Sequence, residues 1–474
     1  MLFLDLPFDV LSLVLNIVER GDALQLAQAS RRAYDLAMPH ILSSVVIGEN
    51  RLAGMRFGPT PPPLMNGARQ LSAFTTFLLS DIRRWPPHIQ SLTMHPNAFG
   101  CPPQPGRLFS LRDYSGGHLF AEALRNAHNL QTLDIGDVEV LLSQCPSFDS
   151  VLCEFARLKQ VKFSGLGPFS AALLEKLRSR PRNIELHGVG THIQAILHSL
   201  RPHGCTLEVL ALEGCFSPPT ALETSVFPHV HTLVLGGYAP PLSTMAKAFP
   251  NVCIGRFHNF RPSWSAVKAF EWVEWPSLDT IEISALLPLA SPVRHVRFGA
   301  GLILNPHTPS ETVSCLLAIL QRTRPVVLSF TISGTPSGFF DGLVAEVRSV
   351  RYLEMTRINT LNDNTGLFLA DALSGICGLP LLAVGLGRVR GIEPSVSDMD
   401  AGAAAMIADM LPTVRFISSF VNSKSANGDS DCKNRRWFRV TSKPSDTHRR
   451  VEEVPRQEVG GITSFLESLD REGG

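Results

Sequence analysis

The strongest constraint on the fold of this chain is a pattern of apolar residues that recurs from residue 89 onward. An apolar residue is followed by two others, a second apolar residue, one other and a third apolar residue. Between Leu133 and Ile281 successive copies lie about 25 residues apart when Ile184/Leu186 and Val252/Phe257 are counted as degenerate copies. The copies are Ile89/Leu92/Met94, Leu130/Leu133/Ile135, Leu158/Val161/Phe163, Leu207/Leu210/Leu212, Val230/Leu233/Leu235, Leu278/Ile281/Ile283, Val293/Val296/Phe298, Val327/Phe330/Ile332, Val350/Leu353/Met355 and Leu379/Leu382/Val384.

Proline and glycine mark the same places in many of these copies. Pro stands five residues before the middle apolar position, where it ends a helix ahead of a strand. Gly stands four residues after that position, where a chain leaving a strand often needs a positive φ. The pattern predicts a strand and a helix in each copy, at a spacing typical of leucine-rich units. These residues are Pro87, Pro228, Pro250, Pro276, Pro325 and Pro412, and Gly165, Gly188, Gly214, Gly237 and Gly334.

We therefore predict an α/β repeat fold, a leucine-rich-repeat-like βα solenoid with a parallel sheet. The alternative, a doubly wound nucleotide-binding fold, would need a phosphate loop, and the sequence has no Gly-x4-Gly-Lys-Ser/Thr. Helices are expected between the strands at residues 171–178, 192–200, 242–249, 266–275, 312–321, 339–347, 367–376 and 403–411.

The first fifty residues do not follow the repeat. Pro7 pre-sets the first turn of a helix, and from Val10 onward its apolar residues form two adjacent stripes. One stripe can pack inward while the other binds a partner, or the following helices of the chain can bury both. Gly21 is predicted as the C-terminal cap, with a second helix at 23–36 and a strand at 45–47. The stripes are Val10/Val14/Ile17 and Leu11/Leu15/Val18.

These features divide the chain into four parts. Residues 1–47 are a short helical module. Residues 48–80 are a Pro-rich linker and a connecting helix. Residues 81–420 are the irregular solenoid. Residues 421–474 are a polar, partly disordered tail, in which only residues 437–440 have the pattern of a strand.

Two stretches of the helical module resemble an F-box. Leu6-Pro7-Phe8-Asp9-Val10-Leu11 is similar to the start of that motif, and residues 22–32 fit its second helix. The chain looks like the F-box proteins with irregular leucine-rich repeats that are abundant in filamentous fungi. It departs from their pattern at Asp9, where Glu is commoner, and at Tyr34, where Trp is frequent. Its repeats also have Gly in place of the usual Asn.

The resemblance implies the substrate-recognition subunit of a Skp-cullin-F-box ubiquitin ligase. The N-terminal helices would bind a Skp-type adaptor and, through it, a cullin, and the repeats would bind an unknown target protein. Such a subunit is not an enzyme, because the recruited proteins transfer the ubiquitin. The adaptor-binding residues that the resemblance and the stripes suggest are Leu6, Pro7, Val10, Leu11, Val14 and Leu15.

Two functions of other classes stay open. One is an intracellular protein-binding scaffold with no role in ubiquitin transfer. The other is an enzyme whose site is assembled from scattered residues, since catalytic triads are not local in sequence. The sequence contains no Gly-x-Ser-x-Gly, His-Glu-x-x-His or Cys-x-x-Cys. We therefore expect no catalytic residue, no cofactor and no metal.

Two groups of residues resemble ligand sites and are interpreted otherwise. The Gly-rich stretch 385–391 lacks the spacing of a dinucleotide fingerprint and is predicted to be a turn after a strand. A second group lacks the short spacings of zinc ligands and is interpreted as turn and core residues. Its members are His203, Cys205, Cys215, His229 and His231.

Charge and hydropathy limit the partners. Lys and Arg together number 43, and Asp and Glu 42, for a net charge of +1. That balance disfavours a nucleic-acid partner. The N-terminus lacks the basic leader of a secretory signal, and no apolar run is long enough to cross a membrane. We expect no membrane partner and a cytoplasmic or nuclear location.

The target is expected to bind the side chains that alternate with the buried pattern along the strands. If Leu133 and Ile135 point inward, then Asp134 points out, and the same rule applies to the other strands. Their mixed charges suit a protein surface better than a phosphate backbone. The residues expected to contact the target are Asp134, Lys162, Glu185, Glu282, Arg297 and Glu354.

Overall fold

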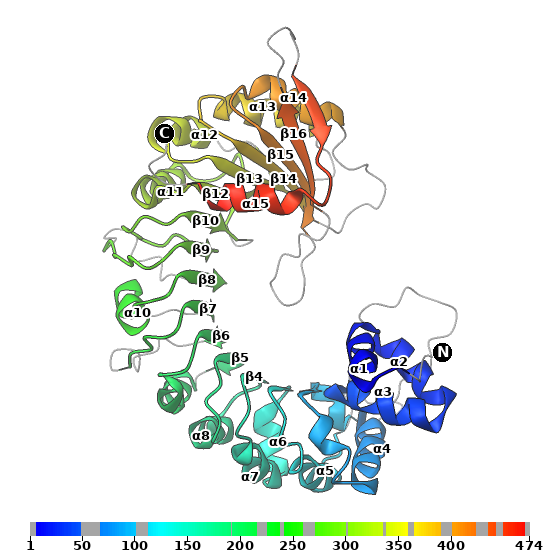
Figure 1. The fold of residues 1–474 in the computed structure, drawn as a ribbon. Coiled ribbons are helices and arrows are strands. Elements are labelled where there is room, and N and C mark those ends of the chain that lie inside the picture. Colours follow the sequence, from blue (N-terminus) through cyan, green and yellow to red (C-terminus); the bar gives the residue numbers. More distant parts are fainter. Residues whose placement is uncertain are drawn as a thin grey trace, which may run out of the picture. The chain divides into compact units, whose positions relative to one another are not determined.

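The structure is a computed structural model, and the chain forms two compact units, Met1–Val230 and His231–Gly474. In both units parallel strands alternate with helices (Figure 1), which confirms the predicted α/β class with an open, mostly parallel sheet. We call the sheet face that packs on the connecting helices the back face, and the other the front face. The described residues are 6–48, 67–100, 112–190, 192–215, 225–237, 241–258, 271–299, 302–334, 338–358, 365–389, 401–422, 435–441 and 449–469.

The described strands of unit 1 pair in chain order, and every pair is parallel. The middle apolar residues of the repeats lie side by side, and Leu92, Leu133 and Val161 are completely buried. The sheet begins inside the predicted helical module, because β1 pairs with β2. The strands are β1 (Ser44–Ile47), β2 (Ser91–Met94), β3 (Thr132–Ile135), β4 (Gln160–Ser164), β5 (Asn183–Gly190) and β6 (Val209–Cys215).

Helices fill the connections of unit 1 on its back face (Figure 1). Two of them match the helices predicted at 171–178 and 192–200 to within a few residues. The predicted positive φ is present at Gly165, Gly188 and Gly214, with φ of 65°, 71° and 75°; Gly165 directly follows β4, whereas Gly188 and Gly214 lie within the last residues of β5 and β6. The elements are α4 (Gly67–Ser80), η3 (Pro86–His88), η4 (Pro96–Phe99), α5 (Gly117–Leu124), α6 (Val138–Gln144), α7 (Ser147–Glu154), α8 (Pro168–Lys176), α9 (Ile193–Ser199) and η5 (Arg201–His203).

Three helices form the N-terminal module: α1 (Phe8–Ile17), α2 (Arg20–Ala29) and α3 (Arg31–Ser43). Gly21 lies in the first turn of α2, so its assignment as a C-terminal cap was wrong. The predicted second helix is divided at Ser30, whose hydroxyl accepts a hydrogen bond from the Ala33 N–H and caps α3. Helix α3 continues through Pro39 and ends at Ser43, the residue before β1.

The described strands of unit 2 are parallel up to β15, and the last two are antiparallel. Gly237 and Gly334 have the predicted positive φ, at 108° and 148°. The strands are β7 (Thr232–Gly237), β8 (Ile254–His258), β9 (Thr280–Ile283), β10 (His295–Phe298), β11 (Ile303–Leu304), β12 (Val327–Ile332), β13 (Tyr352–Arg357), β14 (Ala383–Val389), β15 (Phe416–Asn422), β16 (Arg436–Thr441) and β17 (Arg450–Glu453).

The C-terminal part of unit 2 is more ordered than the sequence suggests. The predicted strand at 437–440 is part of β16, and β17 and helix α15 (Val459–Glu467) lie in the stretch that was predicted to be a polar, partly disordered tail. Apolar residues of this segment, Val454, Ile462 and Leu466, are buried against the sheet. The other helices are α10 (Leu242–Ala248), α11 (Ser310–Thr323), α12 (Phe339–Glu346), α13 (Thr365–Ile376) and α14 (Ala401–Met410).

Three further predictions about unit 2 are corrected. In β12 and β14 the middle position of the pattern lies two residues from the predicted one. Leu353, the middle residue of β13, pairs with Leu328 and not Phe330, and with Val384 and not Leu382. A shift of two leaves the same face inward, so the spacing could not reveal it. Gly385 lies inside β14 and not in a turn. Residues 271–275 are not helical, and the rest of the helix predicted at 266–275 lies outside the described residues.

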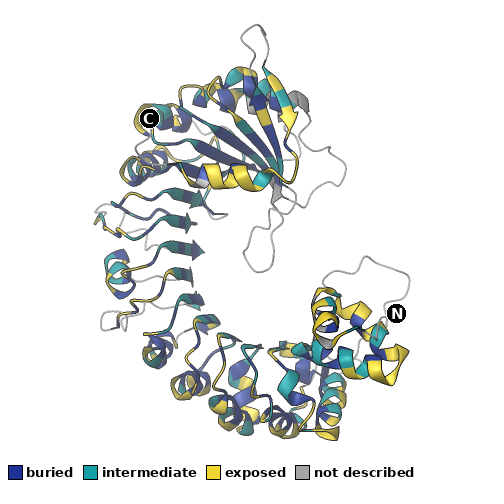
Figure 2. Ribbon diagram, in the orientation of Figure 1, coloured by how far each residue is buried: buried dark blue, intermediate teal, exposed yellow. Residues whose placement is uncertain are grey.

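Burial follows the alternation expected of a sheet covered on its back face (Figure 2). Strands β2 and β3 alternate between half-buried front positions and buried back positions. No helix in the described ranges is both long and apolar enough to span a membrane.

Candidate functional site

Helix α1 buries one side and exposes another. Leu11 and Leu15 are only 2% and 5% exposed, so they belong to the core of the helical module. Leu13 and Ile17 are 64% and 85% exposed, and Val10 is also exposed. The spacing i, i+3, i+7 places Val10, Leu13 and Ile17 on one face of the helix, which we call the α1 stripe.

The burial of α1 changes the set of residues that can contact an adaptor. Pro7 is exposed, and Leu6 and Val14 are half-buried, so all three are accessible. Leu11 and Leu15 were predicted to contact the adaptor, but their burial makes them core residues. Periodicity identifies two stripes and does not say which of them the following helices cover. Leu13 was missed because it lies outside both predicted stripes.

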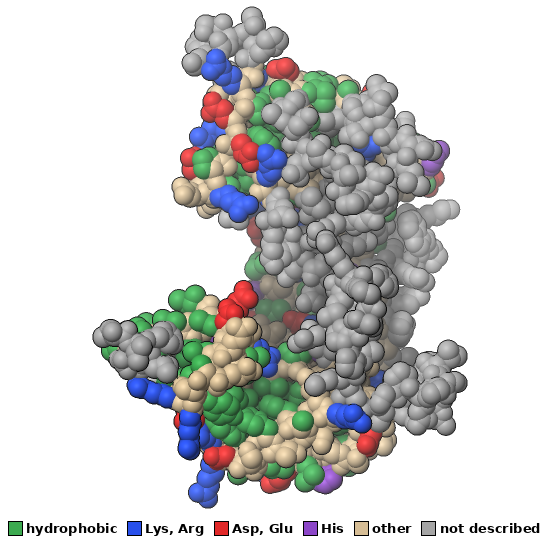
Figure 3. All heavy atoms as spheres, turned by 90° about the vertical axis from the view of Figure 1, so that its right-hand side faces the viewer, with side chains coloured by type: hydrophobic (Ala, Val, Ile, Leu, Met, Phe, Trp, Pro, Cys, Tyr) green, Lys and Arg blue, Asp and Glu red, His purple; other side chains and the backbone are tan. Residues whose placement is uncertain are grey.

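Contacts between α3 and the two residues before η3 fix the helical module on the rest of unit 1. The rings of Tyr34 and Trp85 meet edge to face with centroids 5.9 Å apart. Arg84 stacks on Trp85 at 4.3 Å and donates to Asp35 at 2.7 Å. Hydrophobic side chains gather among the helices at this end of the unit (Figure 3). The α1 stripe is therefore carried by a module with a fixed position on the first strands.

Charged side chains cross the front face of unit 1. Asp134, Lys162 and Glu185 hold matching positions on β3, β4 and β5, and Lys162 Nζ lies 3.5 Å from Glu185 Oε2. Further along the strands, His187 Nδ1 lies 2.9 Å from Glu213 Oε2. We call these five residues the charged ladder. All of them are half-buried on the front face, which agrees with the predicted strand phase for the first three.

Neighbouring carboxylates keep His187 protonated near neutral pH. Glu185, whose Oε2 lies 3.9 Å from Nε2, and Glu213, which is hydrogen-bonded to Nδ1, raise the pKa of His187 to about 9, so its ring is a cation. The His187 ring in turn lowers the pKa of Glu185. Burial raises the pKa of Asp134, against the influence of Lys162. The ladder thus presents charges of both signs at fixed positions, which is suitable for binding a protein surface.

In unit 2 the three predicted contact residues differ in accessibility. Glu282 and Arg297 pair across β9 and β10 and are half-buried on the front face. Glu354, on β13, is only 5% exposed, so its assignment to the contact surface is corrected. It is enclosed by other front-face groups: Tyr352 Oη donates to it at 2.6 Å, and Ser329 Oγ at 2.9 Å.

An arginine of the C-terminal segment neutralises this buried carboxylate. Arg435 Nη2 lies 2.8 Å from Glu354 Oε1, and Arg435 Nη1 donates to Tyr352 Oη at 2.7 Å. Burial alone would raise the pKa of Glu354, but Arg435, Arg297 and the Tyr352 hydrogen bond lower it to about 2. Arg435 also stacks on Phe420 at 4.5 Å. The group is therefore a structural ion pair and not a free contact surface.

The sequence analysis did not identify Arg435 as part of this group, although a glycine inside β14 was a sign that another segment approaches the strand closely. A Cβ on Gly385 would lie 3.0 Å from Ser418 Oγ and 3.1 Å from Tyr352 Oη. Glycine inside a strand often marks such a close approach. This explains the Gly-rich stretch that was predicted to be a turn.

Among the histidines and cysteines singled out in the sequence, the described side chains form no ligand cluster, and the side chain of Cys215 lies outside the described part of the structure. His203 is buried and donates from Nε2 to the Leu174 carbonyl at 2.8 Å, and burial lowers its pKa. Cys205 is exposed and has a free thiol. Within the described ranges, no three metal-ligating side chains come together.

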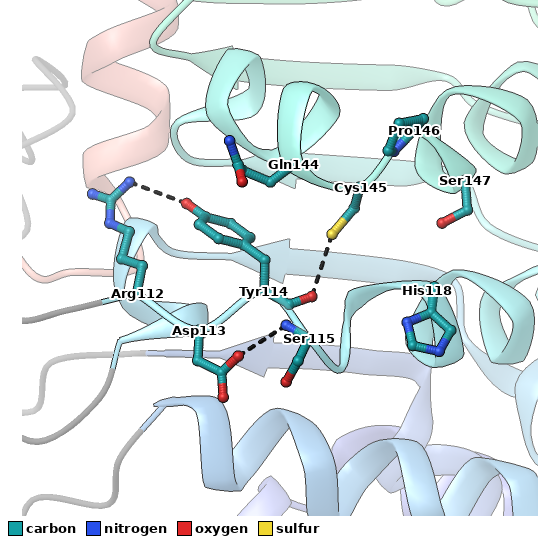
Figure 4. A pocket seen from close by; sticks show the side chains of 9 residues that line it. All are labelled: Arg112, Asp113, Tyr114, Ser115, His118, Gln144, Cys145, Pro146 and Ser147. Atoms are coloured by element: carbon teal, nitrogen blue, oxygen red, sulfur yellow. Dashed lines mark hydrogen bonds between the residues drawn. The ribbon is translucent and has the colours of Figure 1, made fainter.

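A pocket of about 820 Å³ lies in unit 1 between the residues that precede α5 and those that join α6 to α7 (Figure 4). Cys145 donates its thiol to the Tyr114 carbonyl at 3.4 Å, and burial raises its pKa. Arg112 is engaged by Asp137. The cysteine is therefore held as a thiol, unlike an activated nucleophile. The lining residues are Arg112, Asp113, Tyr114, Ser115, His118, Gln144, Cys145, Pro146 and Ser147.

Comparison with known proteins identifies no relative: no protein-family model matches the chain, and no curated protein matches its sequence.

Proposed function

We propose that the chain is the substrate-recognition subunit of a Skp-cullin-F-box ubiquitin ligase. Its α1 stripe binds a Skp-type adaptor, which connects it to a cullin, and its front face binds the target protein. The chain itself has no catalytic role, cofactor or metal. It acts in the cytoplasm or the nucleus and needs neither nucleic acid nor membrane.

The observation that carries this proposal is the α1 stripe. Two large apolar side chains on adjacent turns, Leu13 and Ile17, are mostly exposed. Exposed apolar residues that line one face of a helix are suited to a hydrophobic groove on a partner. Val10 of the stripe belongs to the stretch 6–11 that resembles the start of an F-box, and Leu13 and Ile17 follow it on the same helix.

The charged ladder of unit 1 and the pair Glu282 and Arg297 of unit 2 support binding of a protein target. Their charges alternate in sign, whereas a phosphate backbone requires Lys and Arg throughout. Half-buried charged side chains of this kind contribute more to specificity than to affinity.

Capture of a purified Skp-type adaptor tests the proposal. The change Leu13→Asp plus Ile17→Asp should lower the affinity at least a hundredfold, since each buried side chain contributes about 1.5–3 kcal/mol. Leu119→Asp on α5 is the matched control, because Leu119 is an exposed leucine on another helix. Capture that is unchanged by the double substitution would refute the assignment of α1. Leu13 and Ile17 are chosen in place of Leu11 and Leu15, because substitution of those two buried residues would unfold the module.

The second candidate is a protein-binding scaffold with no role in ubiquitin transfer. The charged ladder favours it equally, because a front face that binds a protein does not need an adaptor. The capture experiment separates the two: a scaffold binds its partner but no adaptor.

A further inference from the structure

The last helix of the chain, α15, lies against the front face of unit 2 (Figure 1). Ile462 and Leu466, one turn apart on α15, are buried in a cluster with Val327, Tyr352 and Ala383. These three strand residues lie side by side on β12, β13 and β14. They form an apolar row on the front face, which α15 covers together with Trp437 and Val454.

Two arginines contact the ends of α15. Arg294 donates to the Leu466 carbonyl at 3.0 Å, near the C-terminal end of the helix, where a cation is favoured. Arg439 donates to Glu458 at 2.7 Å, next to the first residue of the helix. The covered surface therefore combines an apolar row with a charged contact at each end. A helix that binds this surface must therefore match it both in its apolar side chains and in the direction in which it runs.

Helix α15 is weak by itself. It has only nine residues and contains Gly460 and Gly461, which disfavour a helix. Isolated helices of this length are not stable in water. Thr463 and Ser464, on its side away from the sheet, are exposed, whereas the ring of Phe465 lies 5.9 Å from the ring of Phe416 on β15. The helix therefore depends on the strand face for its shape, while the strands belong to a sheet that continues on both sides.

We propose that the apolar row of β12–β14, with Arg294 and Arg439, is a docking surface for an amphipathic helix of the target protein, and that α15 occupies it as an internal competitor. The partner helix has two apolar side chains at i and i+4, an acidic residue at its N-terminal end and a C-terminal end that reaches Arg294. This inference deepens the proposed function and rests on it for the identity of the helix donor.

Competition makes a quantitative prediction. A helix in solution binds only the fraction of molecules from which α15 has dissociated, so its apparent affinity is reduced by that fraction. Weakening α15 in the full chain should therefore increase the affinity for a helix added in trans.

The test uses a fluorescent peptide that spans residues 455–469 and the full chain. The chain with Ile462→Asp plus Leu466→Asp should bind this peptide at least tenfold more tightly than the unmodified chain. The matched control is Thr463→Asp plus Ser464→Asp, which adds the same charge to the exposed side of α15 and should leave affinity unchanged. A peptide with both apolar residues changed to Asp should not bind.

Two results would overturn the proposal. One is equal peptide affinity for all three chains, and the other is no binding by the Ile462→Asp plus Leu466→Asp chain although its thermal unfolding remains cooperative. Peptide-independent dimers of the unmodified chain that exchange α15 would assign the surface to a second copy and would also overturn it.

If the chain with Ile462→Asp plus Leu466→Asp does not fold, hydrogen exchange of the unmodified chain tests the proposal instead. The amides of α15 should exchange at least tenfold faster than those of β13, because α15 opens independently of the sheet. Equal protection would contradict displacement. Neither peptide binding nor hydrogen exchange involves an adaptor, so failure of this proposal is distinguishable from failure of adaptor capture through α1.

Discussion

The front faces of the two units have the same strand geometry and different surroundings. In unit 1 the first front-face row is Ser91, Thr132, Gln160 and Asn183, and all four side chains are half-buried. In the part of unit 2 formed by β12–β15 the row is Val327, Tyr352, Ala383 and Phe416, and it is covered by the C-terminal segment. The comparison teaches that strand alternation identifies a face, whereas the chemistry of that face determines whether a further layer covers it.

The largest expected effect is at the ion pair that the cover of unit 2 buries. Arg435→Ala leaves the Glu354 carboxylate buried without its nearest cation, which should lower the free energy of unfolding of unit 2 by roughly 3–5 kcal/mol. Lys162→Ala, in the half-buried pair of unit 1, should cost less than about 1 kcal/mol. Chemical denaturation of both variants measures the difference. Equal losses would mean that the two front faces are equally solvated.

A smaller effect should follow from filling the space that glycine leaves in unit 2. Gly385→Val places methyl groups against Tyr352 and Ser418, and overpacking of this kind costs about 1–3 kcal/mol. Thr93→Val, at the matching front position of β2, adds no volume to a covered layer and should change stability by less than about 0.5 kcal/mol. If thermal unfolding shows that Gly385→Val is tolerated as well as Thr93→Val, the layer over β14 is not tightly packed.

The smallest effect is on the pH dependence of stability, which should differ between the two units. The pKa of His187 is about 9 in the folded chain, against an ordinary value of 6.5. Its contribution to stability is complete below pH 6.5 and is lost as the pH rises through 9. Because the ring is partly exposed, we expect a loss on the order of 1 kcal/mol.

Glu354 should respond on the acid side. Its folded pKa of about 2 lies below its ordinary value of 4.5, so its contribution is present above pH 4.5 and lost as the pH falls through 2. Denaturation at several pH values, with His187→Gln as the control that removes the alkaline loss, measures both. An alkaline loss that persists in His187→Gln would have another origin.

The sequence predicted the features of the fold that depend on local geometry. Positive φ at Gly165, Gly188 and Gly214 followed from one glycine per repeat near the end of each strand, because glycine adopts that conformation without steric cost. The buried strand positions followed from period two.

The sequence did not predict which surfaces another segment covers. Leu11 and Leu15 look the same as Leu13 in composition, and only the packing of α2 and α3 determines which of them is buried. The enclosure of Glu354 depends on Arg435, which lies 81 residues later in the chain and follows no repeat. The apolar front residues Val327 and Phe416 were the available signal for this cover.

The reversal of direction after β15 has a consequence for self-association. A parallel repeat sheet ends in a strand whose free N–H and C=O groups can pair with another molecule. Here β16 and β17 pair antiparallel beyond β15. The outermost of the two, β17, spans only Arg450–Glu453, and three of its four side chains are charged. Short, charged edge strands discourage aggregation, so this terminal hairpin protects the sheet against edge-to-edge polymerisation as well as completing the fold.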